Sequence, residues 1–273
     1  MSASRYPWKN TLSQESCCDV VEKLKVKNLN LFYGSKQILH NLNLNINKNC
    51  VTGIIGPSGC GKSSFVQCLN RMIELTPSAK VNGDIFLDQQ SIFDSRLELI
   101  ELRKKIGIVF QEPTPLPLSI ENNIALPLKE HQFSSIEERV KQSLVDVGLW
   151  PEVKDKVKKP AALLSGGQKQ RLCLARALAL QPEVILMDEP CSNLDPLSTE
   201  IIEELILELK SKYTIVIVTH NLAQARRICD HIYAFWNNKQ YGYGEILESG
   251  SCADIFERPN SDTLADYVGG LRG

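Results

Sequence analysis

A glycine-rich segment between an apolar run and a helix-forming stretch constrains this chain more than any other feature. The segment is GPSGCGKSS, residues 56–64, and it follows the short apolar run at residues 50–55. It fits the pattern GxxxxGK[ST], in which glycines let the backbone turn tightly and point N–H groups at phosphate oxygens. The pattern predicts a strand, a phosphate-binding loop and then a helix. In such a loop Lys62 would reach the terminal phosphates and the Ser63 hydroxyl could bind Mg²⁺.

A second apolar run, VILMDE at residues 184–189, ends in two carboxylates. Alone, an apolar strand that ends in Asp-Glu is common, and a surface acidic pair would be the default interpretation. The phosphate loop upstream reverses that preference and makes a catalytic role the better interpretation. Asp188 is then suited to hold Mg²⁺, and Glu189 to act as the general base that polarises an attacking water.

The segment LSGGQ at residues 164–168 is the most discriminating. Ser165 and Gln168 have capping-box spacing, and Gly166 and Gly167 leave the helix N-terminus open to an anion. The simpler alternative is a well-capped helix. Because the chain already has one phosphate loop, a second helix end prepared for phosphate indicates a second ligand or a second subunit.

The remaining pattern predicts an α/β fold. Leu42, Leu44 and Ile46 alternate with asparagines, which is typical of an antiparallel strand with one wet face. Ser135 and Glu138 have capping-box spacing before an amphipathic helix. Residues 213–219 are nearly all β-branched and predict a strand covered on both faces. We expect a mobile N-terminal extension over residues 1–22, and one nucleotide-binding domain over residues 23–273 with a helical insertion at about 90–165.

Six motifs occur in the order and approximate spacing of the ATPases of ABC transporters, and the resemblance runs from about residue 24 to the end. The motifs are Walker A (56–64), the Q-loop residue Gln111, the signature (164–168), Walker B (184–189), the D-loop (192–195) and the H-loop residue His220. The resemblance implies a P-loop NTPase (RecA-like) core with an antiparallel β subdomain and an inserted α-helical signature subdomain. It also implies a head-to-tail dimer in which each ATP lies between one copy's Walker A and the other copy's signature.

The resemblance assigns roles residue by residue. The catalytic set would be Glu189, His220, Gln111 and Lys62, with Mg²⁺ held by Ser63, Gln111 and Asp188. ATP would contact Tyr33, whose ring would stack on adenine, and the loop residues Gly56, Pro57, Ser58, Gly59, Cys60, Gly61, Lys62, Ser63 and Ser64. The second copy would contribute Ser165, Gly166, Gly167, Gln168 and Asp195. For Asp195 the sequence alone supports an N-cap followed by Pro196 in the first helical position.

A narrower resemblance is to the phosphate-import branch of the family. It is carried by the Walker A segment, NRM at residues 70–72, LWPEVKD at 149–155, RLCLAR at 171–176 and VTHN at 218–221. The chain departs from that branch at Ser64 and Lys169 and at CSN, residues 191–193, and residues 236–243 form a longer stretch than usual. None of these departures removes an expected catalytic group. This branch implies ATP-driven phosphate import with two integral-membrane permease subunits and, indirectly, a periplasmic or extracellular phosphate-binding protein.

Composition argues against nucleic-acid-binding, secreted and membrane-spanning proteins. The 31 basic and 32 acidic residues nearly cancel, so nothing global indicates a nucleic-acid partner. The N-terminal residues lack the apolar core of a signal peptide, and no apolar run approaches the length of a membrane-spanning helix. We therefore expect a peripheral protein at the cytoplasmic face of the cell (inner) membrane, with the span supplied by other chains.

Three alternatives remain open at this point. One is an ABC importer for another solute. The second is a soluble ABC ATPase of DNA repair or translation, but repair members carry very long insertions and translation members usually carry two cassettes. Here only 103 positions separate Lys62 from Ser165 of the signature, and there is one cassette. The third is a degenerate ATP-binding scaffold, which would lack a catalytic group, whereas Glu189, His220 and Gln111 are all present.

Overall fold

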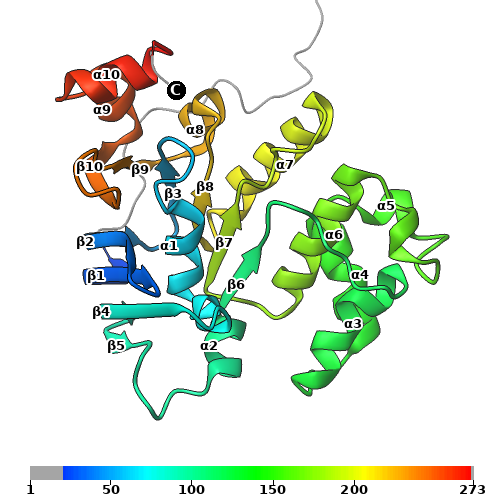
Figure 1. The fold of residues 1–273 in the computed structure, drawn as a ribbon. Helices are drawn as coiled ribbons and strands as arrows, with labels where there is room; N and C mark the ends of the chain where they lie inside the picture. The colour runs from blue at the N-terminus through cyan, green and yellow to red at the C-terminus, as the bar shows by residue number, and fades with distance from the viewer. Residues whose placement is uncertain (1–20, 272–273) are drawn as a thin grey trace, which may run out of the picture.

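A mixed ten-stranded sheet organises the chain in the computed structural model, which describes residues 21–271 (Figure 1). The strand order across the sheet is β5-β4-β1-β2-β10-β9-β3-β8-β7-β6. The strands are β1 (Glu22–Tyr33), β2 (Lys36–Asn47), β3 (Val51–Ile55), β4 (Ala79–Leu87), β5 (Gln90–Ser91), β6 (Ile106–Val109), β7 (Val184–Asp188), β8 (Thr214–Val218), β9 (His231–Asn237) and β10 (Gly244–Ser251).

Helices pack on the central strands and also form a separate group beyond the sheet's β6 edge (Figure 1). They are α1 (Lys62–Leu69), α2 (Leu99–Lys105), α3 (Ile120–Glu130), α4 (Ile136–Asp146), α5 (Trp150–Val153), α6 (Gly166–Ala179), α7 (Pro196–Leu209), α8 (Leu222–Ile228), α9 (Cys252–Glu257) and α10 (Asp262–Val268), with 3-10 turns η2 (Met72–Leu75) and η3 (Ala161–Leu163). Within residues 21–271, no helix is both long enough and apolar enough to span a bilayer.

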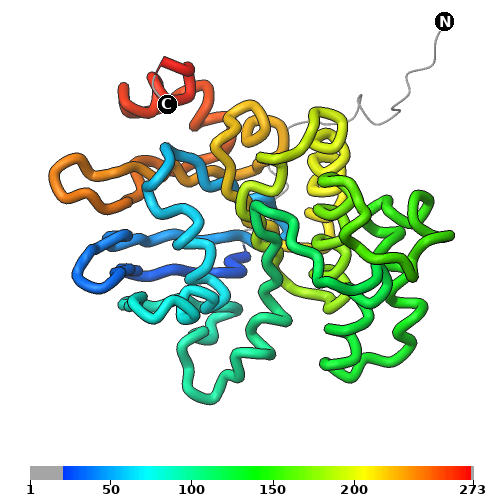
Figure 2. Tube along the Cα trace, turned by 45° about the vertical axis from the view of Figure 1, so that its right-hand side comes forward, coloured from blue at the N-terminus to red at the C-terminus, as the bar shows by residue number. Residues whose placement is uncertain are grey.

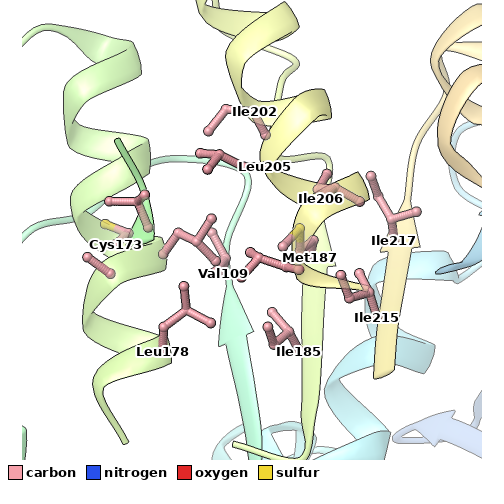
Figure 3. Packing of buried hydrophobic residues seen from close by; sticks show 14 of the residues in the cluster. Val109, Cys173, Leu178, Ile185, Met187, Ile202, Leu205, Ile206, Ile215 and Ile217 are labelled. Atoms are coloured by element: carbon pink, nitrogen blue, oxygen red, sulfur yellow. The ribbon is translucent and has the colours of Figure 1, made fainter. Parts of the chain in front are cut away.

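The central strands β9, β3, β8, β7 and β6 run parallel. Every residue of β3, β7 and β8 is buried, which confirms strands covered on both faces. Side chains alternate between the two faces. Ile185 and Met187 pack toward α6 and α7 (Figure 3), whereas Val184 and Leu186 belong to the cluster that includes α1. Strand β7 therefore contributes apolar side chains to two hydrophobic clusters, one on each face of the sheet.

The antiparallel part of the sheet starts with the β1–β2 hairpin, which turns at Gly34. Leu42, Leu44 and Ile46 of β2 are buried and the asparagines between them are exposed, as the alternation predicts. This part joins the parallel strands through β10, where Gly244 pairs with Leu39.

The helices α3, α4, α5 and α6 lie together on the side of the central strands opposite the antiparallel hairpins (Figure 2). Strand β6 falls inside the range expected for the insertion, yet it pairs in register with β7 as part of the central sheet. The proposed boundaries of about 90 and 165 stay a prediction. Of the expected extension over residues 1–22, residues 1–20 lie outside the described residues.

The capping box expected at Ser135 is wrong, although helix α4 begins at the next residue as expected. Ser135 has a φ of 52°, in the left-handed region, and its side chain makes no capping hydrogen bond. An N-cap hydroxyl reaches the helix amides from an extended backbone conformation, which Ser135 does not have. Helix α4 is stabilised by burial of Val140 and Leu144 instead.

Candidate active site

The predicted site residues gather where several parallel strands end. Strand β3 leads into the phosphate loop, β7 ends at Asp188, β8 is followed by Thr219 and His220, and β6 is followed by Phe110 and Gln111. Because these strands are parallel, their carboxyl ends lie along one edge of the sheet. The topology therefore brings together groups that lie more than half the chain apart in sequence.

The phosphate loop encloses the ammonium group of Lys62. The Lys62 Nζ donates to the carbonyl oxygens of Gly56, at 2.7 Å, and Pro57, at 2.8 Å, and the residue is 6% exposed. Gly56 has a φ of 141°, and a Cβ there would lie 2.1 Å from the carbonyl oxygen of Phe235 in β9. Gly61, the N-cap of α1, has a φ of 91°. Only glycine fits these two positions, and the result is a tight turn around a buried positive charge at a helix N-terminus, which suits phosphate oxygens.

Ser63 and Asp188 provide two oxygen donors next to this loop. The Ser63 Oγ donates to Asp188 Oδ1 at 2.9 Å. Burial raises the pKa of the Asp188 carboxyl, and the nearby Glu189 carboxylate raises it further, while the Ser63 hydrogen bond opposes the shift. Hard oxygen donors of this kind fit Mg²⁺, which takes one or two protein ligands and completes its shell with phosphate oxygens and water. Among residues 21–271, no group of three or more His, Cys, Asp or Glu side chains forms a self-sufficient metal site.

Glu189 is held by two side chains from different loops. The His220 Nδ1–H donates to Glu189 Oε2 at 2.8 Å, and the Gln111 Nε2 donates to the same oxygen at 3.3 Å. The backbone of Glu189 is left-handed, with a φ of 46°, and its N–H donates to the Val218 carbonyl of β8 at 2.9 Å. A strained non-glycine residue fixed from three sides is typical of a functional position.

Tyr33, the expected adenine-stacking residue, lies beside the same loop. Its Oη is 3.1 Å from Ser64 Oγ at the start of α1. Cys60, another predicted contact, is fully buried. Ser58 and Gly59 are exposed at the tip of the loop.

Comparisons with known proteins agree with this geometry. The family model described as "ABC transporter" matches residues 39–192. The chain is 48% identical, over 94% of its length and 93% of the relative's, to "Phosphate import ATP-binding protein PstB 1" of Nitrosococcus oceani. It is also 48% identical, over 91% of its length and 86% of the relative's, to "Phosphate import ATP-binding protein PstB" of Malacoplasma penetrans.

The chain belongs to the ABC transporter family.

Among solved structures, the dimeric ATP-binding cassette MJ0796 in a post-hydrolysis state bound to ADP and phosphate matches with a TM-score of 0.68 and 30% identity. The match covers 84% of this chain and 98% of that one. The family and the P-loop NTPase fold expected from the sequence are therefore confirmed.

The ABC signature lies at the start of α6 with the predicted cap. The Ser165 side chain accepts from the Gln168 N–H at 3.3 Å, and Gln168 Oε1 accepts from the Ser165 N–H at 3.1 Å. Within residues 21–271, no hydrogen bond or ion pair joins this helix end to residues 56–64. Any contact of the signature with a bound nucleotide stays a prediction that needs a second copy.

The D-loop residue Asp195 lies between two residues, Leu194 and Ser198, that approach the signature glycines. It caps α7 by accepting from the Ser198 N–H at 3.0 Å and from the Ser198 hydroxyl at 2.6 Å, and these bonds lower the pKa of Asp195. A Cβ on Gly167 would lie 2.4 Å from that same hydroxyl. The second glycine of the signature thus lets the two segments expected to face a second copy pack side by side.

Two contacts of the signature helix and the phosphate loop were not predicted from the sequence. Glu152 of α5 accepts from Gln168 Nε2 at 2.7 Å and pairs with Arg171 at 2.7 Å. Burial alone would raise the pKa of Glu152, but these two hydrogen bonds hold it below its usual value. Tyr267 of α10 lies next to the backbone of Gly56; burial raises the pKa of Tyr267, and this backbone contact opposes the rise. Neither contact has a spacing signal in the sequence.

Proposed function

We propose that this chain is the ATP-hydrolysing subunit of an ABC importer and couples ATP binding and hydrolysis to phosphate import. The observation that carries the proposal is the set of groups at the strand ends: Lys62 in its loop, the Ser63–Asp188 pair, and Glu189 held by His220 and Gln111. The solute is proposed from 48% identity, over more than nine-tenths of the chain, to two proteins named for phosphate import.

Nucleotide binding would use groups that already have suitable chemistry. Lys62 and the loop amides would hold the phosphates, and Tyr33 would stack on the adenine ring. Ser63, Asp188 and Gln111 would hold Mg²⁺, which neutralises charge on the β- and γ-phosphate oxygens when it is bound.

Hydrolysis needs positioning and charge stabilisation more than covalent chemistry. In the proposed mechanism the Glu189 carboxylate orients the attacking water and accepts its proton. His220, through its Nδ1–H, fixes the position of the carboxylate, and Gln111 donates to the same oxygen. Lys62 remains the fixed positive charge.

The working unit would be a homodimer, because in the part of the chain from residue 21 to 271 no hydrogen bond or ion pair joins the phosphate loop to the predicted second-copy contacts Ser165, Gly166, Gly167, Gln168 and Asp195. The dimeric state of MJ0796 supports this arrangement. Two integral-membrane permease subunits would complete the transporter, placing the dimer at the cytoplasmic face of the cell (inner) membrane. A periplasmic or extracellular phosphate-binding protein would act indirectly, and no nucleic acid is involved. We retain residues 23–273 as the ATP-binding domain, with a helical insertion at about 90–165.

The test is phosphate uptake in a strain that lacks the gene for this chain. Expression of the wild-type chain should restore uptake of labelled phosphate, and the Lys62→Ala variant should not. Sulfate and molybdate uptake serve as controls for other oxyanions. Restoration of another solute's uptake, with phosphate unaffected, would overturn the proposed substrate but not the ATPase activity.

A further inference from the structure

A buried carboxylate joins the two helices that follow the D-loop and the H-loop. Glu203, in the middle of α7, is 7% exposed and accepts two hydrogen bonds from Arg227 of α8, one to each oxygen, both at 2.8 Å. Its Oε1 also accepts from the Nε2 of Gln224, at 3.2 Å. Both oxygens of Glu203 are thus engaged by α8.

This contact is linked to the first turn of α8. The Asn221 side chain caps α8 by accepting from the backbone N–H of Gln224 at 3.0 Å, and Asn221 directly follows His220. Gln224, 1% exposed, therefore bonds the helix cap through its backbone and Glu203 through its side chain. Two consecutive hydrogen bonds therefore link Glu203 to Asn221, the residue next to His220.

At its other end the contact is linked to the D-loop. Helix α7 begins after its N-cap Asp195, and Glu203 lies about two turns into it, so a displacement of the D-loop moves Glu203 with the helix. Glu203, Gln224 and Arg227 line a cavity of about 760 Å³ that Glu189 and His220 also line. The ion pair and the catalytic pair thus border the same cavity, and the hydrogen bonds that connect them run through α8.

A gain in folding stability does not by itself explain the ion pair between Glu203 and Arg227. Burying the Glu203 carboxylate has a desolvation cost, although the side chain of its partner Arg227 stays 53% exposed, and apolar residues of similar volume often stabilise a helix contact as well. The neighbours of Glu203 on α7 include the buried Ile202 and Ile206, so an apolar contact was available to this helix. What the bidentate pair adds is a fixed relative orientation of α7 and α8.

We propose that Glu203 is a positioning residue, which clamps α8 to α7. The clamp keeps the hydrogen bond between His220 and Glu189 in place, and it makes His220 move with the D-loop when a second copy contacts Asp195. The inference rests on the proposed function, because it assumes that Glu189 and His220 act in ATP hydrolysis. It predicts that loss of the clamp lowers the chemical rate without weakening ATP binding at Lys62.

The experiment compares Glu203→Gln with Glu208→Gln in the full-length protein. Glu208 lies on the same helix, is exposed and takes no part in the clamp. For Glu203→Gln we expect the single-turnover rate to fall roughly 10- to 100-fold, since small misplacements of catalytic groups have effects of this size. The ATP Kd should stay within about twofold of wild type, and Glu208→Gln should match wild type. If Glu203→Gln does not fold, Arg227→Lys tests the same clamp with the charge retained.

A double-mutant cycle separates positioning from a general structural role. If Glu203 acts through His220, Glu203→Gln should cause no further loss in a His220→Ala background. A wild-type rate in Glu203→Gln, or full multiplicative loss in the double variant, would overturn the inference. By contrast, a wild-type protein without ATPase activity would overturn the proposed function itself, before any variant is considered.

Discussion

The Nδ1 of His220 lies 2.8 Å from Oε2 of Glu189, and the two residues come from loops that follow neighbouring strands of the sheet. This contact places a hydrogen-bond donor on the carboxylate that follows the Walker B strand. Since Gln111 donates to the same oxygen, the carboxylate has a fixed direction before any ligand is considered. The proposed mechanism depends on this direction.

Replacing Glu189 with Gln should remove the general base while keeping the size of the side chain. We expect ATP turnover to fall by about 10²–10⁴-fold, the usual contribution of a positioned acid or base. Because binding groups are untouched, the variant should accumulate as an ATP-bound dimer in size-exclusion chromatography. Turnover at the wild-type rate would show that Glu189 is not the base.

Tyr33 offers a test of adenine stacking. Tyr33→Phe keeps the aromatic face and loses only the contact with Ser64 Oγ, so its ATP affinity should stay close to wild type. Tyr33→Ala should bind ATP about 5- to 150-fold more weakly, which corresponds to about 1–3 kcal/mol for a stacked base. Isothermal titration calorimetry measures both. Equal affinities for the alanine and phenylalanine variants would refute stacking.

Alanine variants of Gly56 and Gly59 test how closely β9 approaches the phosphate loop. Both have positive φ values, so alanine at either position carries a backbone cost of about 1–2 kcal/mol. A Cβ at Gly59 meets nothing within 4 Å, whereas at Gly56 it would lie 2.1 Å from the Phe235 carbonyl oxygen. Gly56→Ala should therefore unfold at a clearly lower urea concentration than Gly59→Ala. Identical midpoints would contradict the close approach of β9 to the loop.

His231, the first residue of β9, should make the stability depend on pH. Burial lowers the pKa of His231 below the value of 6.5 that it has in an unfolded chain. The unfolded state then binds a proton more readily than the folded state. The contribution of neutral His231 to the free energy of unfolding is therefore complete above pH 6.5 and is lost as the pH falls below that value. For one proton the slope is at most about 1.4 kcal/mol per pH unit.

Urea unfolding between pH 7.5 and 5.5 measures this slope. The His231→Gln variant should show a flatter dependence than wild type, and His131→Gln, which leaves His231 in place, should show the wild-type dependence. If His231→Gln keeps the full slope, other groups account for it.

The sequence predicted the local features of the site well, because each has a short-range signal. The phosphate loop lies between β3 and α1, Ser165 and Gln168 form their capping box, and Asp195 caps α7, all as expected. Each of these depends on residue types within about ten positions, where spacing dictates geometry.

The long-range contacts could not be predicted in the same way. Glu203 and Arg227 are 24 positions apart on two helices, and Glu152 and Gln168 are 16 apart across a turn-rich segment. No periodicity links such pairs, because the packing of whole elements brings them together. Ser135 shows the opposite case, in which correct capping-box spacing is overridden by a left-handed backbone.

In the proposed dimer two copies share each ATP site, one contributing Lys62 and the other the Ser165 end of α6. The most direct test mixes a Lys62→Ala chain with a Ser165→Arg chain, each inactive alone, and purifies the mixed dimer through two different affinity tags. If the site is shared, this dimer should recover up to about half of the wild-type ATPase rate, since it contains one intact site. A verified mixed dimer as inactive as its parents would contradict the shared site.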